Sequence, residues 1–101
     1  MPQGSWGNFV IEAISFSDRF KAEYKKLPPE LQDQVDQALR LLRENPASRR
    51  LRFERLTDYR NPTIYTIHVT ANHSHKISMA INGRIATLRR IGTHKEIDRN
   101  P

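Results

Sequence analysis

Two histidines and a lysine in the second half of the chain are the residues best suited to chemistry. His68 and Lys76 lie in segments where apolar and polar residues alternate, and His94 follows the segment 84–91. An imidazole exchanges protons near neutral pH, so either histidine could act as base or acid. Lysine can hold a phosphate, and Arg89 or Arg90 could stabilise its developing charge. These residue types suit acid–base chemistry at a phosphate ester, and an ordinary surface or strand position is the alternative for each.

The basic residues of the chain are concentrated in its second half. Residues 1–47 carry 6 basic and 7 acidic side chains, whereas residues 48–101 carry 11 and 4, so the net charge of +6 arises there. Such a surface suits a polyanion or an acidic protein, although a solvated loop or a protected strand edge is the other interpretation. The predicted RNA-binding residues are Arg49, Arg50, Arg52, Arg55, Arg84 and Lys95.

Several classes of protein and site are excluded or disfavoured. The 101 residues include no cysteine, which excludes disulfide frameworks, thiolate zinc sites and cysteine nucleophiles. His73 and His75 could join His68 or His94 at a metal, but no carboxylate supports such a site, so we expect no metal and no other cofactor. No apolar run approaches the ~20 residues of a membrane span, and the N-terminus does not resemble a signal peptide. We therefore expect a cytoplasmic protein.

The first half of the chain predicts a strand and two helices. Residues 9–14 form a short apolar run typical of a strand. Ser17 is a suitable N-cap for a helix that ends at Pro28-Pro29, and a second amphipathic helix extends from Glu30 to the Asn45-Pro46 pair. Together the two helices form a hairpin.

The second half predicts a meander of strands. Residues 65–70 and 76–81 alternate with period 2, and Asn82-Gly83 is a hairpin signal that leads into residues 84–91. That last segment is mixed on both faces, which indicates a bulge. Residues 51–56 are either a further strand or a basic loop.

These elements predict an α+β domain. We expect an N-terminal strand and a helical hairpin packed on one face of a twisted antiparallel β-sheet. The opposite face would present Thr66, His68, Lys76 and Ser78 to solvent. Residues 1–8 are predicted to be a flexible lead-in, and residues 9–101 a single domain.

The order of the motifs resembles the RelE/ParE superfamily of bacterial type II toxins. The resemblance covers Phe9 to Arg99 and rests on a strand, a helix, the joint LPPEL, a helix that ends in ENP, then RLTD, two alternating strands, an NG hairpin and LRRIGTH. It implies the RelE-like toxin fold and a cognate antitoxin with an acidic, amphipathic segment. A RelE-like member would cut mRNA in the ribosomal A site without a metal. A ParE-like member would inhibit DNA gyrase, and a degenerate member would bind only its antitoxin.

The resemblance also implies roles for individual residues. His68 aligns with a position that is basic in RelE-like toxins, Lys76 with an arginine, and His94 with a histidine found in many members. Three departures accompany this match. Lys76 loses the bidentate phosphate contact of an arginine, Lys95 stands where the family often has an acid, and the C-terminal tyrosine of some active members is missing.

Overall fold

The computed structural model describes residues 10–60, 62–70, 72 and 74–101. The flexible lead-in predicted for residues 1–8 lies outside the described residues. None of the described helices is long and apolar enough to cross a membrane. In chain order the elements are β1 (Ala13–Phe16), α1 (Asp18–Lys25), α2 (Pro29–Glu44), β2 (Glu54–Arg60), β3 (Thr63–His68), β4 (His75–Asn82), β5 (Ile85–Thr93) and α3 (His94–Arg99).

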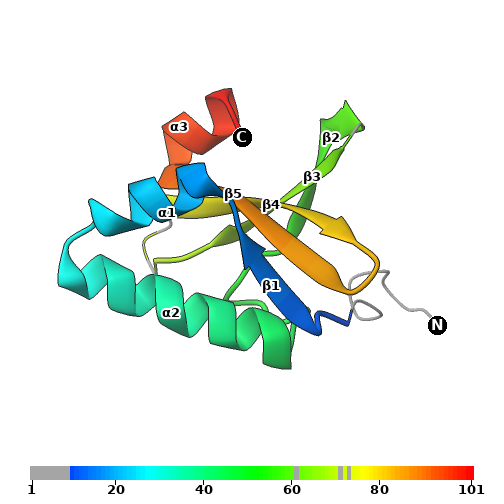
Figure 1. Ribbon diagram of the computed structural model, residues 1–101, viewed down its shortest axis with the longest axis horizontal. Coiled ribbons are helices and arrows are strands. Elements are labelled where there is room, and N and C mark those ends of the chain that lie inside the picture. Colours follow the sequence, from blue (N-terminus) through cyan, green and yellow to red (C-terminus); the bar gives the residue numbers. More distant parts are fainter. Residues whose placement is uncertain (1–9, 61, 71, 73) are drawn as a thin grey trace.

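The strands form one sheet in the order β1-β5-β4-β3-β2 (Figure 1). Strands β2 to β5 pair antiparallel, as predicted. The expectation of a wholly antiparallel sheet with the first strand on its face is wrong, because β1 joins the edge of the sheet parallel to β5. Parallel neighbours cannot be joined by a tight turn, and here two helices and three strands intervene in the chain. The α+β class is confirmed.

The helical hairpin forms as its capping residues predict. Ser17 is the N-cap of α1, where its Oγ accepts a hydrogen bond of 3.1 Å from the Phe20 amide. Pro29 opens α2, and Asn45 ends it. The side chains of Phe20, Val35 and Leu42 are fully buried in a core that also includes Ile77 and Met79 of β4.

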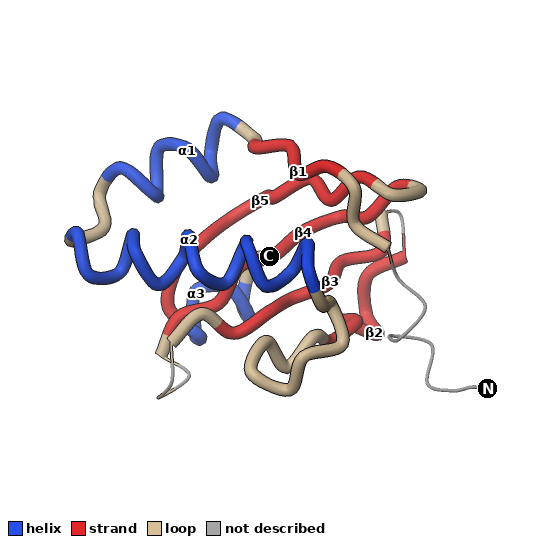
Figure 2. Tube along the Cα trace, turned by 90° about the horizontal axis from the view of Figure 1, so that it is seen from below, coloured by secondary structure: helices blue, strands red, loops and turns tan. Residues whose placement is uncertain are grey.

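The other face of the sheet is covered, and the predicted solvent-exposed surface is wrong. Helix α3 lies on this face, on the far side of the sheet from α2 (Figures 1 and 2). Thr66 and Ser78 are fully buried, while Lys76 is 3% exposed and His68 8%. These polar side chains therefore form the floor beneath a helix.

Helix α3 was missed because it is short, yet its start carries a recognisable sequence signal. Thr93 and Glu96 form a capping box: the Thr93 hydroxyl accepts from the Glu96 amide, and the Glu96 carboxylate accepts from the Thr93 amide at 2.9 Å. These bonds hold the pKa of Glu96 below its ordinary value. Ile97 then buries its side chain completely.

The bulge predicted in the last strand is confirmed. Ser78 pairs with Arg90 and Met79 pairs with Leu88, so Arg89 is an additional residue on β5. The bulge lies four residues before Thr93, the end of β5, after which α3 begins.

Candidate active site

An open groove of about 1070 Å³ lies between α3, β2 and the loop that precedes β2. We call it the histidine groove. Six of the residues singled out in the sequence line it, from four separate segments of the chain: Arg49, Arg52, Arg55, His68, Lys76 and His94.

The two histidines of the groove are neighbours. Their ring centroids are 5.7 Å apart and their planes are inclined by 46°. His68 ends β3, while His94 begins α3, where its amide donates a hydrogen bond of 2.9 Å to the Ser74 carbonyl. The strand and the helix thus place two imidazoles, 26 residues apart in sequence, at one wall of the groove.

Asp98 was not identified as a candidate from the sequence. Its carboxylate contacts two residues that were, Lys76 and His94. Lys76 Nζ donates to Asp98 Oδ1 at 2.7 Å, and His94 Nδ1 lies 2.7 Å from Asp98 Oδ2. Asp98 is four residues after His94, so both side chains share one face of α3. This spacing becomes informative only once the segment is known to be helical.

The position of Lys76 differs from its predicted role as a phosphate contact. Its side chain is 3% exposed, and its ammonium is directed to the Asp98 carboxylate. Lys76 borders the groove from below α3, whereas the Asp98 side chain is 44% exposed.

The arginines of the groove are held by the loop before β2. Leu51 is buried in the core, and its carbonyl accepts a hydrogen bond of 2.6 Å from the His68 amide. Arg52 adopts a positive φ of 47°, an uncommon conformation for a residue with a side chain. The loop therefore fixes Arg49 and Arg52 beside His68. Both interpretations of residues 51–56 were partly right, since the loop comes first and β2 begins at Glu54.

The groove carries acidic groups as well as basic ones. Arg49, Arg52, Arg55 and Lys76 line it together with Glu54, Asp58 and Asp98. With neutral histidines its net charge is close to zero. Local placement of the arginines, rather than a uniformly positive field, would hold a phosphate.

Arg89 and Arg90 lie outside the groove and bind the end of the chain. Arg89 Nε donates to the Pro101 backbone oxygen at 3.3 Å, and Arg90 Nη1 donates to the Asn100 carbonyl at 2.8 Å. Arg90 also donates to the Glu23 carboxylate through Nε and Nη2, at 3.0 and 2.7 Å. Both arginines thereby connect the bulge of β5 to the segment after α3.

The other predicted RNA-binding residues are dispersed. Arg84, at the β4–β5 turn, forms an ion pair of 2.6 Å with Glu12. Lys95 is exposed on α3 but does not line the groove. Arg50 lines a neighbouring groove that it shares with Arg49 and Arg52.

Metal ligands do not gather in the part of the chain that the structure describes. Among those residues no group of three or more histidines, cysteines or carboxylates could hold a metal ion. His73, the partner of His75 in the metal site considered from the sequence, lies outside the described residues.

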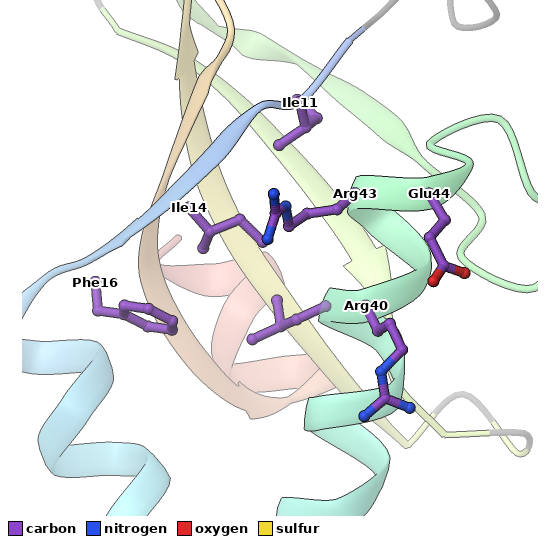
Figure 3. A pocket seen from close by; sticks show the side chains of 7 residues that line it. Ile11, Ile14, Phe16, Arg40, Arg43 and Glu44 are labelled. Atoms are coloured by element: carbon purple, nitrogen blue, oxygen red, sulfur yellow. The ribbon is translucent and has the colours of Figure 1, made fainter.

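A second groove, of about 580 Å³, lies between β1 and α2 (Figure 3). We call it the β1–α2 groove. Its apolar lining includes Ile14, Phe16 and Leu39, and its charged lining is Arg40, Arg43 and Glu44. Apolar side chains beside charged ones suit a protein segment better than a reacting phosphate.

The fold matches solved structures, although the sequence matches no protein family model and no curated protein. A chain of the RelB–RelE antitoxin–toxin complex from Methanococcus jannaschii superposes with a TM-score of 0.66 and 21% identity, over 86% of this chain and 99% of that one. YafQ from E. coli gives a TM-score of 0.67 and 16% identity, over 83% and 94%. YoeB from Staphylococcus aureus, solved as a dimer, gives 0.64 and 18%, over 81% and 95%.

The chain has the RelE toxin fold. This RelE-like fold confirms, at the level of structure, the resemblance carried by the order of the sequence motifs. The match spans nearly the full length of each of these three chains. The histidine groove therefore lies on the fold that these structures share.

Proposed function

We propose that the protein is the toxin of a type II toxin–antitoxin system, a metal-independent endoribonuclease that cuts mRNA in the ribosomal A site in the cytoplasm. The observation that carries this proposal is the pair of imidazoles, His68 and His94, 5.7 Å apart in a groove with arginines. Two imidazoles provide both proton transfers of RNA cleavage, and the arginines provide charge for the phosphate. The open groove suits a polymer strand.

The proposed reaction needs no external reagent. One neutral imidazole removes the proton of a ribose 2′-hydroxyl, and the resulting oxygen attacks the adjacent phosphorus. The bond from phosphorus to the 5′-oxygen breaks as the second imidazole, protonated beforehand, gives its proton to that oxygen. The products are a 2′,3′-cyclic phosphate and a 5′-hydroxyl. Arg52 and Arg55 would stabilise the charge on phosphorus.

The β1–α2 groove supports the second part of the proposal, a cognate antitoxin. Among the residues that the structure describes, β1 is an edge strand with a neighbour on one side only. Phe16, the last residue of β1, is an exposed aromatic residue, and Arg40 and Arg43 of α2 line the same groove. An extended segment with apolar and acidic side chains could add to the strand edge, bury its apolar residues in the groove and pair with the arginines.

The nuclease proposal is tested by in vitro translation followed by primer extension on the message. We expect codon-positioned cuts with the natural protein, and a loss of about 10²- to 10⁴-fold in cleavage rate for His94→Ala, since a proton-transfer group is removed. His75→Ala is the matched control, because His75 lies on β4 and does not line the groove. Intact message together with gyrase-linked DNA breaks would reject the proposal in favour of a gyrase inhibitor. Intact message without such breaks would leave only antitoxin binding.

A further inference from the structure

We propose that Asp98 is a positioning residue that makes His94 the general base of the histidine groove, and that Lys76 holds Asp98 in place. This inference rests on the proposed nuclease function. It assigns the base, which residue types alone leave open between two histidines, and it gives Lys76 a role other than phosphate binding.

The contacts that position His94 begin at Lys76, the most buried of the three residues. Lys76 is 3% exposed, so its ammonium has lost most of its water and requires a partner. The Asp98 carboxylate supplies it, with 2.7 Å between Lys76 Nζ and Asp98 Oδ1. One carboxylate oxygen is therefore held from below, and the other is directed along α3.

The second carboxylate oxygen determines the tautomer of His94. Asp98 Oδ2 lies 2.7 Å from His94 Nδ1. An ionised carboxylate can only accept hydrogen bonds, so Nδ1 must carry the proton. The Nε2 atom of the neutral imidazole is then an unprotonated acceptor. When Nε2 takes a proton from the 2′-hydroxyl, the imidazolium that forms is stabilised by the adjacent carboxylate, the same logic by which an aspartate supports the base of a serine protease triad.

The assignment of the acid follows from the same contacts. His94 takes the first proton, so the neighbouring imidazole of His68 is the group left to protonate the 5′-oxygen. Lys76 acts through Asp98 and does not touch the phosphate. The arginines of the groove then provide the contacts to phosphate.

The variant Asp98→Asn tests directly whether Asp98 sets the tautomer of His94. The Lys76 ammonium is a donor, so the amide oxygen stays towards it and the amide nitrogen turns to His94. Nδ1 must then accept a hydrogen bond, and its proton moves to Nε2, which can no longer act as a base. We expect kcat for message cleavage to fall about 10²- to 10⁴-fold with little change in KM. Asp33→Asn, which removes an exposed carboxylate on α2 that does not line the groove, should leave kcat unchanged.

A double variant separates positioning from a purely structural role. If Asp98 acts through His94, Asp98→Asn adds no further loss of rate to His94→Ala. A further loss of tenfold or more in the double variant would overturn the inference.

Nitrogen-15 NMR of the imidazoles provides a readout that does not need the nuclease to be active. We expect His94 to carry its proton on Nδ1 in the natural protein and on Nε2 in Asp98→Asn. If the tautomer is the same in both, Asp98 does not position His94, whatever the rates are. If the tautomer changes as expected but the natural protein leaves message intact, the positioning is real and the nuclease function is what fails.

Discussion

Removal of the Ile97 side chain tests whether α3 holds the site together. Ile97 is 0% exposed and is the one buried side chain among the six residues of α3, all of which are described. A Cβ placed on Gly92 would lie 3.6 Å from Ile97 Cδ1, so the helix packs closely on the strand beneath it. Truncation of a buried isoleucine to alanine costs about 2–5 kcal/mol.

We expect this cost to fall on the docking of α3 rather than on the whole fold. The principal core lies on the other face of the sheet and does not include Ile97. Even about 2 kcal/mol changes the equilibrium between docked and undocked helix about 30-fold. Ile97→Ala should therefore undock α3, separate His94 and Asp98 from Lys76, and abolish cleavage while most of the protein stays folded.

The assay combines native-state hydrogen exchange with chemical denaturation and message cleavage. In Ile97→Ala, amides of α3 should lose protection while amides of β3 and β4 keep theirs. Leu42→Ala is the matched control, because Leu42 is fully buried in the principal core on α2. It should lower the free energy of global unfolding by a similar amount without selective exchange in α3.

The reasoning is refuted if Ile97→Ala behaves like Leu42→Ala. A uniform loss of protection across the sheet and α3, with a free energy of global unfolding lowered by about 2–5 kcal/mol, would mean that the helix unfolds only with the whole domain. Retained cleavage with an undocked helix would show that the α3 residues are not needed for the reaction.

Two further predictions concern the capping box of α3 and the β1–α2 groove. The Thr93 amide and hydroxyl hold the pKa of Glu96 below its ordinary 4.5, so the capping box stabilises α3 above that pH and weakens as pH falls through the lowered pKa. The Thr93 amide shift should titrate with a midpoint below 4.5 and lose that titration in Glu96→Gln, whereas a midpoint at or above 4.5 contradicts the capping role. At the β1–α2 groove, Phe16→Asp and Arg43→Glu should each raise the Kd for the proposed cognate antitoxin about tenfold or more in a titration, whereas Lys21→Glu on α1 should not. An unchanged affinity in both groove variants would place the partner elsewhere.

The parts of the fold that could be predicted are those with strong local signals. Ser17, the two prolines after Leu27, and Asn82-Gly83 each set a boundary through backbone chemistry that does not depend on distant residues. The parallel pairing of β1 could not be predicted, because nothing in a short strand states which neighbour it will have. The six-residue helix α3 has no hydrophobic period to indicate it, since it contains one buried isoleucine, and the Thr93–Glu96 capping box is its one local signal.

Those two omissions had different consequences for the site. The position of β1 does not affect which side chains line the histidine groove, because β1 lies at the edge of the sheet opposite to β2. The missing α3 changed the interpretation of a whole face. Alternation correctly put His68 and Lys76 on the side away from the main core, yet polar alternation was taken to mean exposure. A polar face can equally be the floor beneath a helix that brings its own carboxylate, and Asp98 is that carboxylate.

The positive charge of the second half of the chain has two separate roles, which a count of charges cannot distinguish. Arg49, Arg52 and Arg55 line the histidine groove and remain available to a phosphate. Arg89 and Arg90 bind backbone oxygens at the end of the chain, because the bulge in β5 brings both within reach of it. These contacts hold the segment that follows α3, so part of the basic charge keeps the helix on the sheet, and with it the proposed base. The charge in the sequence thus bears on the proposed catalysis in two ways, directly at the groove and indirectly through the helix that completes it.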